Sequence, residues 1–543
     1  MIDAIRLRRL ALVAACLFVV AAFVSACGSS SSKSSSATSS ATATSSTSSA
    51  PTGAPKAGGS LTVLEEAGYS GAWPAGLDPA TNTNGAADQD QMNAIYGQLF
   101  QLGAGGHVTP DLATSATPKN GGKTWVITLQ PNLKFSDGTP LNGQAVVFNW
   151  KRDLASSCTC KPILPPVTSI TAPTASSVQI TMAAPDGAFQ NQSLVANLTW
   201  IASPTALKKL GAQQFKITPV GAGPFTVVSD TLSNTLVLKK NPNYWQAGHP
   251  YLDNLTFKAT ADDETALETL EAGGAQAYNG MATPSLVSTY KSHFTTTEQP
   301  ATSPYDIQLN TAAPPFNNKN ARLAIYYATD AAVIDQKLFG DQFQVVQGFT
   351  APGGLFYYPN VPGYPTYDLA KAKQLVKSLG GLNVNFFTLA SPVNQNFMEA
   401  LQTLWKEAGI NASIHLYSLA GLIQAFDTKT WQAALQTAGA WDPAAGVGLA
   451  FRFLSTSPFS GVKDPKLDAL ILGAQAAVNP STRDTLYQQA AQYIAKNADG
   501  PFLFPLASWN VAAHNVQGPG LTTVIPSIVV NTAPLWQDVS YTQ

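Results

Sequence analysis

The side chains that commonly carry catalysis are present, but their spacing does not form a catalytic motif. Gly122-Lys123-Thr124 imitates the end of a phosphate-binding loop, yet position 117 is Thr and a strand pattern follows instead of a helix. Gly68-Tyr69-Ser70-Gly71 is one residue short of a nucleophile elbow, since position 72 is Ala. No H-E-x-x-H pair occurs among the five scattered histidines, His107, His249, His293, His415 and His514.

Acidic and cysteine pairs do not supply a reactive site either. Glu65-Glu66 and Asp262-Asp263 are adjacent, and consecutive side chains diverge in both helices and strands. Cys158 and Cys160 are separated by one residue, so a disulfide between them would be strained, and no His or further Cys lies near in sequence to complete a metal site. We therefore expect no enzyme, no cofactor and no metal. A carboxylate pair from remote segments and the redox state of the two cysteines stay open.

Composition narrows the class of protein. The formal net charge is −1, and a nucleic-acid-binding surface would need a clustered basic excess. Charged residues are 12% of the chain, well below the usual ~25%, which is typical of an exported protein with a surface of Ser, Thr, Asn and Gln. The sequence thus excludes a nucleic-acid partner and favours a location outside the cytoplasm.

The start of the chain predicts export and a lipid anchor. Three arginines precede an apolar run of 14 residues, 10–23, which is short for a membrane span of ~20 residues and suits a signal peptide. Val24-Ser25-Ala26-Cys27 resembles the bacterial lipobox. That resemblance implies a signal peptide over 1–26 and diacylation of Cys27, which would hold the protein on a membrane; an ordinary signal with an incidental cysteine is the alternative. Residues 27–58, rich in Ser, Thr and Ala, predict a disordered tether.

The stretch 124–153 predicts a strand, a tight turn and a helix. Trp125, Ile127 and Leu129 follow the period-two pattern of a half-buried strand. The turn Ser136–Pro140 places Asp beside Gly, which tolerates a positive φ, and Asn142 is placed to cap the helix. None of these residues is an obvious catalyst, so the stretch is first of all a scaffold.

Several phrases of the sequence resemble solute-binding protein family 5, the extracytoplasmic receptors of peptide and nickel ABC importers. The order of KFSDGTPL between a strand and a helix is similar to the family signature. Further matching phrases are VGAGPF at 220–225, NPNYW at 241–245 and PPFNNKNARLAIYYATD at 314–330, in which Asn317 and Asn318 stand where acids are common. The resemblance covers nearly all of the chain after the tether and implies two α/β lobes.

Local patterns predict the elements of the second lobe and its neighbours. The stretches 383–389 and 410–416 have strand patterns and flank a helical pattern over 397–408. Strand, helix, strand is a βαβ unit, which calls for parallel pairing. Helices are also predicted over 91–102, 262–272, 318–329, 330–339 and 368–379, and a capping box of Ser481 and Asp484 predicts another helix. Glu65 and Glu66 are expected in a loop after a strand at 60–64, and further strands are expected at 502–509 and 527–530.

The family resemblance also implies a ligand site. Glu66 and Tyr69 match the place of a loop that lines the ligand cleft in this family. Trp441 and Asp442 match a segment that brings an aspartate to the ligand's α-ammonium, although the phrase is shorter here than the family's W-x-x-D-x-x-D-P. A charge removed from water needs a charged partner, and Arg452 is placed to grip a carboxylate in a bidentate fork. The alternatives are an exposed carboxylate, a packing aromatic, a turn-capping Asp and a structural cation.

These observations predict a two-lobed α/β fold like that of periplasmic binding proteins, type II and class C-like, with a first lobe that is discontinuous in sequence. The expected ranges are 59–308 and 506–543 for lobe I and 309–505 for lobe II. The expected function is that of a monomeric, lipid-anchored substrate-binding protein on the outer face of the cytoplasmic membrane, which closes over a small polar solute, foremost a short peptide, and delivers it to an ABC permease. The alternatives are a secreted hydrolase of cell-wall peptides and a surface lipoprotein without a ligand.

Overall fold

The chain divides into two units, Met1–Ser46 and Thr47–Gln543. The computed structural model describes residues of the second unit: 53–67, 73–82, 88–102, 107–156, 164–299, 301–438, 446–525 and 533–543. Several predicted features therefore lie outside the described residues: the signal peptide, most of the tether, Cys27, Tyr69, Cys158, Cys160, Trp441, Asp442 and the expected strand at 527–530.

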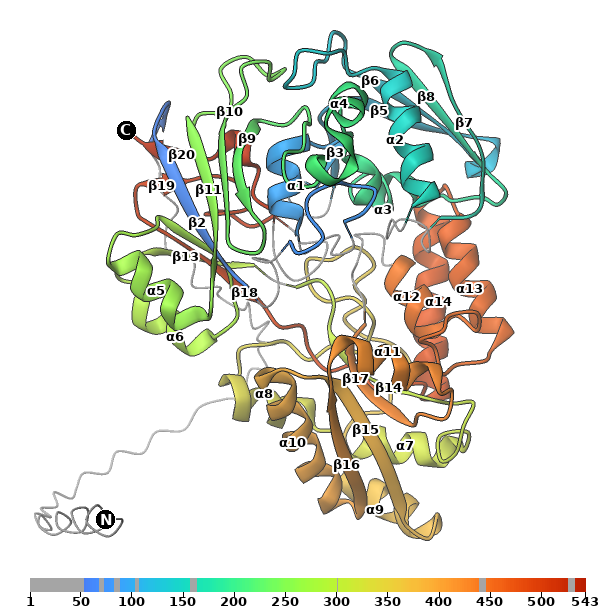
Figure 1. The fold of residues 1–543 in the computed structure, drawn as a ribbon. Helices are drawn as coiled ribbons and strands as arrows, with labels where there is room; N and C mark the ends of the chain where they lie inside the picture. The colour runs from blue at the N-terminus through green and yellow to red at the C-terminus, as the bar shows by residue number, and fades with distance from the viewer. Residues whose placement is uncertain are drawn as a thin grey trace, which may run out of the picture. The chain divides into compact units, whose positions relative to one another are not determined.

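A seven-stranded mixed sheet takes strands from both ends of the chain (Figure 1). Its order is β13-β18-β12-β2-β11-β10-β9, in which β2 runs parallel to both β11 and β12. Because β18 enters from the C-terminal part of the chain, this lobe, which we call lobe I, is discontinuous in sequence. Its strands are β2 (Ser60–Glu66), β9 (Phe225–Thr231), β10 (Thr235–Lys240), β11 (Asn254–Thr260), β12 (Ala277–Met281), β13 (Thr295–Gln299) and β18 (Ser508–Ala512).

A second sheet of lobe I contains the predicted strand, turn and helix. Its order is β5-β6-β8-β7, and α2 (Gly143–Ala155) packs against it. Gly138 has a φ of 82° in the turn, and the Asn142 side chain accepts a hydrogen bond from the Ala145 amide at 3.1 Å, so both predictions are confirmed. Trp125, Ile127 and Leu129 are buried in its core, as the alternation predicted. The strands are β5 (Ala113–Lys119), β6 (Thr124–Leu129), β7 (Val167–Thr174) and β8 (Ser177–Met182).

A four-stranded sheet forms the centre of the part that we call lobe II. Its order is β14-β17-β15-β16, and β15 (Leu382–Leu389) is parallel to β16 (Ile410–Tyr417) across the helix α10 (Pro392–Glu407). The predicted βαβ unit is therefore confirmed. The other strands are β14 (Tyr305–Leu309) and β17 (Ala433–Thr437), and the other helices are α7 (Lys319–Ala328), α8 (Ala331–Phe339), α9 (Leu369–Ser378) and α11 (Leu419–Asp427).

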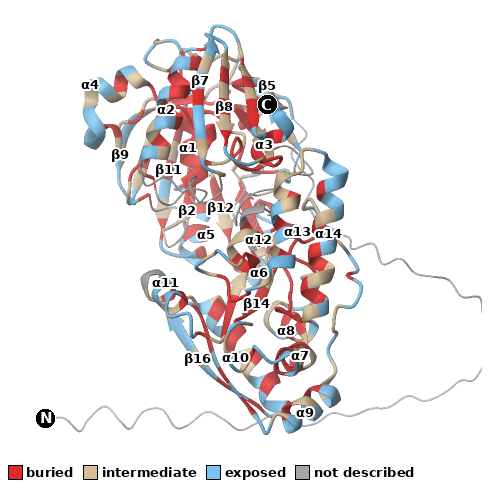
Figure 2. Ribbon diagram, turned by 90° about the vertical axis from the view of Figure 1, so that its right-hand side faces the viewer, coloured by how far each residue is buried: buried red, intermediate tan, exposed pale blue. Residues whose placement is uncertain are grey.

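Three further helices, α12 (Gly446–Phe453), α13 (Pro465–Ala476) and α14 (Pro480–Asn497), share an apolar core with Phe502. The Arg322 guanidinium on α7 donates to the Asn497 carbonyl at the end of α14, which joins this layer to lobe II. Figure 2 shows buried residues along the central strands and exposed outer faces on α9, α13 and α14. The predicted capping box is wrong, because Asn479 caps α14 and accepts from the Thr482 amide.

Three further predictions need correction, two near the N-terminus and one near the C-terminus. The helix expected over 91–102 is α1 (Gln89–Tyr96), which ends at Gly97 with a φ of 65°, and β3 (Phe100–Leu102) follows. Glu65 and Glu66 are not in a loop but are the last two residues of β2. The strand expected at 502–509 begins only at Ser508. The remaining elements are α3 (Phe189–Gln192), α4 (Pro204–Phe215), α5 (Asp263–Glu271), α6 (Pro284–Tyr290), β1 (Pro55–Lys56), β4 (Val108–Pro110), β19 (Val516–Gln517) and β20 (Ser540–Thr542).

The chain passes between lobes I and II twice, and the two passages lie side by side. The first lies between β13 and β14, and the second lies before β18. The Tyr305 amide donates to the Phe504 carbonyl at 3.0 Å, and the Leu503 amide donates to the Tyr305 carbonyl at 2.8 Å. The two chain passages between the lobes are thus held together by a short pair of hydrogen-bonded segments. The boundary residues 308 and 505 themselves stay predictions.

Candidate functional site

Two groups of buried polar residues lie near the ends of parallel strands, one group in each lobe. In open α/β sheets, ligands bind beyond the carboxyl ends of the strands. In lobe I this end of β2 is Glu66, and in lobe II this end of β17 is Thr437. The residues around these two positions make up the candidate site.

The group in lobe I, the β2 cluster, consists of Glu65, Glu66, Asp90, Gln91 and Asn279. The Gln91 side-chain amide donates to Oε2 of Glu65, and the Asn279 side-chain amide donates to Oδ2 of Asp90. Asn279 on β12 lies opposite Glu65 in the parallel register. Oε1 of Glu65 is buried and receives no amide or hydroxyl donor from the described residues. Three elements, β2, α1 and β12, therefore bring two carboxyls and two amides together.

The two carboxyls of the β2 cluster share a proton. Burial raises the pKa of Glu65 well above its usual range, and the neighbouring charge of Asp90 raises it further. Burial also raises the pKa of Asp90, to about 7, against the lowering effect of its hydrogen bonds with Glu65 and Asn279. Two carboxyls in hydrogen-bond contact require a proton between them, because a carboxylate can only accept. At neutral pH the buried pair therefore carries less than its formal charge of −2.

Glu66, the neighbouring residue, has a different environment. It is half-buried, and burial raises its pKa, as do the nearby charges of Asp263 and Asp262 at the start of α5. Asp263 is held in place by the Tyr278 hydroxyl, which donates to Oδ1 at 2.5 Å. Three carboxyl groups thus lie together at the carboxyl end of β2, and such a concentration of negative charge favours a cationic group such as an ammonium.

The group in lobe II, the β17 cluster, consists of Asp306, Gln308, Gln436, Thr437 and Arg452. Arg452 lies in the last turn of α12, and its Nε donates to the Thr437 carbonyl at 2.9 Å. Its Nη2 donates to Oε1 of Gln436 at 3.2 Å, and its own carbonyl accepts from the Gln308 side chain at 3.0 Å. The guanidinium is therefore fixed against the carboxyl end of β17. Nη1 makes no hydrogen bond to the part of the chain that the structure describes.

Asp306 is the buried counter-charge of Arg452. The residue has no exposed surface, and neither of its carboxyl oxygens accepts a hydrogen bond from the residues that the structure describes. Burial raises the pKa of Asp306 to about 7, while the positive charge of Arg452 opposes that rise. Burial likewise lowers the pKa of Arg452, and Asp306 opposes this change. The pair is coupled through space, because no ion-pair contact within 4.0 Å joins the two side chains.

The structure thus places only two of the predicted ligand residues, Glu66 and Arg452, and each lies at a strand end of a different lobe. Tyr69, Trp441 and Asp442 lie in segments outside the described residues that directly follow β2 and β17. Sequence reasoning missed Asp90 and Asp306. No local signal marks either residue as buried: Asp90 lies in the polar stretch QDQMN, and Asp306 falls with Gln308 on the polar positions of an alternating strand, where exposure is expected.

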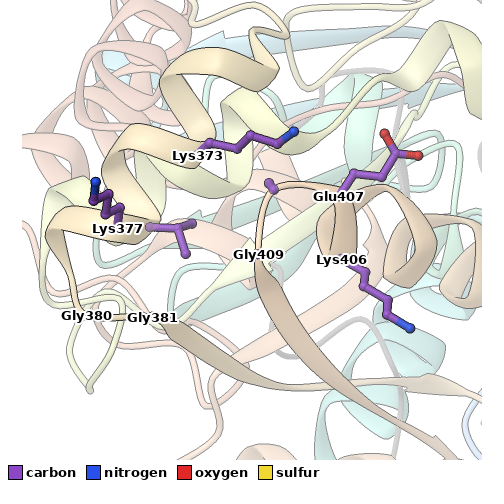
Figure 3. A pocket seen from close by; sticks show the side chains of 9 residues that line it. Lys373, Lys377, Gly380, Gly381, Lys406, Glu407 and Gly409 are labelled. Carbon is purple, nitrogen blue, oxygen red and sulfur yellow. The ribbon is translucent and has the colours of Figure 1, made fainter.

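A hollow of about 510 Å³ on lobe II is a weaker candidate (Figure 3). It lies beside the ends of α9 and α10, and its charged lining residues are Lys373, Lys377, Lys406 and Glu407. Helix C-termini carry partial negative charge, which the lysines offset. The hollow borders the amino ends of β15 and β16, where Gly381 and Gly409 precede the strands. Ligands of open sheets bind at the opposite end.

The described residues form neither a metal centre nor a membrane-spanning helix. Within the described ranges, no group of three or more His, Cys, Asp or Glu side chains is arranged to hold a metal ion. None of the helices formed by these residues combines the length and the apolar character that a membrane crossing needs.

Comparison with known sequences gives a match to a family of solute-binding proteins. The sequence model of the family described as bacterial extracellular solute-binding proteins, family 5 Middle, matches residues 107–458. The glutathione-binding protein GsiB of Shigella flexneri serotype 5b is 29% identical over 346 residues, which are 62% of this chain and 66% of that protein. The match therefore spans just under two thirds of this curated relative.

Solved structures share the fold. The ABC transporter substrate-binding protein CtaP from Listeria monocytogenes has a TM-score of 0.77 at 21% identity, over 90% of this chain and 100% of its own. The periplasmic binding protein DppA from Helicobacter pylori, in complex with the peptide STSA, has a TM-score of 0.73 at 20% identity, over 90% of this chain and 99% of its own. The predicted fold class, two α/β lobes with a discontinuous first lobe, is confirmed.

Proposed function

Because this chain belongs to the bacterial extracellular solute-binding proteins of family 5, we propose that it captures a short peptide, or another small polar solute, and delivers it to the permease of an ABC importer. Members of this family are exported proteins that bind solutes for transport and are not enzymes. The secreted hydrolase considered from the sequence is therefore not supported.

The observation that carries the proposal is that the two chain passages between the lobes lie side by side in one narrow junction. The Tyr305 and Phe504 segments that connect lobes I and II are hydrogen-bonded to each other, so a change of a few backbone dihedrals there would rotate one lobe against the other. Such hinge closure around a ligand is a common switching motion. A ligand that contacts both lobes binds the closed form better than the open form, and this difference in affinity would shift the protein to the closed form.

The ligand would lie between the strand ends of the two lobes. We assign Glu66, with Tyr69 beside it in sequence, to the lobe I side, and Trp441, Asp442 and Arg452 to the lobe II side. Glu66 and Asp442 would accept hydrogen bonds from the ammonium group of a peptide, because a cation that leaves water needs an anionic partner. Arg452 would use Nη1 to bind a carboxylate, while Nε and Nη2 remain on Thr437 and Gln436.

The remaining parts of the proposal concern location and assembly. Diacylation of Cys27 would anchor a monomer to the outer face of the cytoplasmic membrane, and residues 27–58 would act as its tether. The permease would recognise the closed form. Metabolic labelling with a fatty acid tests the anchor, and the variant Cys27→Ala is expected to lose the label and to be released from membranes.

Mass spectrometry of small molecules that co-purify with residues 59–543, followed by calorimetric titration with the peptides found, tests the function. Small-angle scattering is expected to show a smaller radius of gyration at ligand saturation. If none of these peptides or a pool of di- to pentapeptides binds, or if the dimensions stay the same at saturation, the proposal is wrong.

The role of Arg452 needs a design that separates ligand contact from structure. Replacing Arg452 alone would leave Asp306 as an uncompensated buried carboxyl. The comparison should therefore be made in an Asp306→Asn background, in which Arg452→Gln removes the guanidinium without that penalty. A loss of affinity of at least tenfold is expected for a peptide with a free carboxyl terminus, because a hydrogen bond to a charged group contributes ~1.5–3 kcal/mol. If the protein that retains Arg452 bound the corresponding peptide amide as tightly as the peptide with a free carboxyl terminus, a contact between Arg452 and the carboxylate would be contradicted.

A further inference from the structure

Lobes I and II also meet at a place far from their junction in sequence. The loop after β8 in lobe I contacts the turn between α13 and α14 in lobe II. The Gly187 amide donates to the Gln475 carbonyl at 2.8 Å. In return, Nη2 of Arg483 on α14 donates to the Gly187 carbonyl. The backbone amide and the backbone carbonyl of Gly187 in lobe I are thus both hydrogen-bonded to lobe II.

Both sides of this contact are held in place by their own lobe. In lobe I, the Trp125 indole donates to the Asp186 carbonyl at 2.8 Å, and the Asp186 amide donates to the Gly122 carbonyl at 3.1 Å. In lobe II, Nε and Nη2 of Arg483 donate to the Ala477 carbonyl at 3.1 and 2.8 Å. Arg483 is only 6% exposed. The two surfaces are therefore prepared for each other and lose little conformational freedom when they meet.

The packing at this contact leaves no room for a larger residue. A Cβ added to Gly187 would lie 2.1 Å from the Ala477 carbonyl oxygen and 2.3 Å from its carbonyl carbon. A Cβ on Gly122 would lie 2.8 Å from Cγ2 of Val478. The first clash is with backbone, which cannot turn away as a flexible side chain would. The contact can therefore form only with glycine at position 187.

We infer that Gly187 and Arg483 form a latch that positions the two lobes and sets the affinity for ligand without touching it. The inference rests on the proposed function, because it takes the lobes to move about the junction near Tyr305 and Phe504. Since the latch joins segments that the junction does not hold together, rotation of one lobe would break its hydrogen bonds. The latch therefore stabilises only the closed form, and its free energy of formation adds to the free energy of the ligand contacts in that form.

The variant Gly187→Ala tests the latch, and Gly348→Ala is its matched control. Ala fits the backbone of lobe I at position 187, since the φ there is not positive, so only the contact with lobe II is disturbed. At Gly348 the nearest atom to an added Cβ is 3.9 Å away, which is ordinary contact. A peptide identified by co-purification is expected to bind roughly tenfold more weakly to Gly187→Ala, with a faster off-rate, because two hydrogen bonds are lost on closure. Binding to Gly348→Ala should match the wild type.

A second variant and a second measurement keep the test independent of the ligand. Arg483→Met removes the donors from α14, and it should weaken binding in the same direction. In the ligand-free proteins, small-angle scattering should give a larger radius of gyration for Gly187→Ala than for wild type and Gly348→Ala. If wild type binds no peptide, the proposed function fails while this comparison still decides on the latch. Equal scattering and equal affinity of Gly187→Ala and wild type would overturn it.

Discussion

The β2 cluster of lobe I and the β17 cluster of lobe II reduce the negative charge of buried carboxyl groups in different ways. Each buries carboxyl groups near the end of a parallel strand. In the β2 cluster a proton between Glu65 and Asp90 reduces the charge, and two side-chain amides hold the pair. In the β17 cluster the guanidinium of Arg452 offsets Asp306 through space. Asp306 and Asp90 both have a pKa of about 7, so both clusters should lose stability as the pH rises through 7. The lobes should differ in their response to mutation, because one cluster depends on amide donors and the other on a fixed positive charge.

The largest effect is expected from Arg452→Gln. This change leaves Asp306 buried without a counter-charge and removes a donor from the Thr437 carbonyl. We expect the free energy of unfolding to fall by about 3 kcal/mol above about pH 8, where Asp306 is ionised in the wild type, as when one partner of a buried ion pair is removed. The loss should be smaller near pH 6, where the carboxyl is protonated, and urea unfolding at both pH values measures it. The double variant with Asp306→Asn should recover much of the loss, and the absence of any recovery would refute the coupling of the two residues.

The pH dependence of stability is the next largest effect. The pKa of Asp90 is about 7 in the folded protein, above the value of ~3.9 for an unfolded Asp. The stability that this raised pKa gives is therefore complete below about pH 4 and is lost as the pH rises through 7. Each group contributes at most ~1.4 kcal/mol per pH unit, which gives a loss of about 2 kcal/mol between pH 5 and pH 7.

The variant Asp90→Asn isolates this contribution from those of other buried carboxyls. Its free energy of unfolding should fall less steeply with pH than that of the wild type over the same range. Chemical unfolding at several pH values measures the difference between the two slopes. Parallel slopes would mean that Asp90 does not titrate there, and the account of a shared proton in lobe I would be wrong.

Gln91→Leu should have a smaller effect. Oε2 of Glu65 would lose its amide donor in a buried place, and we expect a loss of about 1 kcal/mol. Thermal unfolding below pH 5 and again above pH 7 would check the reason. The loss should be greater at high pH, where Asp90 loses its proton and the pair carries more negative charge for the amide to stabilise. A loss that does not vary with pH would point to packing instead.

Gln436→Leu should have the smallest effect of this series. Nη2 of Arg452 would lose an acceptor at 3.2 Å, while Nε keeps the Thr437 carbonyl. We expect a loss of about 0.5 kcal/mol, the low end for a single hydrogen bond, without any change with pH between 5 and 8. If this variant were as damaging as Gln91→Leu, the two lobes would depend equally on their amide partners.

The elements that the sequence predicted well are those whose signals are local. Asn142 caps α2 and Asp330 caps α8, because a side-chain acceptor needs only the amide three residues ahead. The parallel pair β15 and β16 followed from two strand patterns with a helix between them. The helix over 91–102 was predicted too long because its apolar spacing continued past Gly97, where a φ of 65° ends it.

The polar clusters could not be predicted in the same way. Gln91 and Glu65 are 26 positions apart, and Asp306 meets Arg452 only because β14 pairs with β17 in front of α12. Adjacent carboxylates such as Glu65 and Glu66 were correctly expected to diverge, and their different burial follows from that divergence. A pair such as Glu65 with Asp90 requires knowledge of which helix covers the strand, and a single sequence does not contain this information in a local form.

The narrow junction means that lobe II could be excised from the chain or exchanged as one continuous segment. The chain segments that enter and leave lobe II lie within hydrogen-bond distance of each other, with 3.0 Å between the Tyr305 nitrogen and the Phe504 oxygen. A segment with neighbouring ends can be cut out, exchanged or recircularised with a short linker, and the remaining host can be closed by a few residues. Lobe II therefore has the connectivity of an exchangeable cassette, so that a new specificity could be grafted by replacing one continuous stretch of the gene.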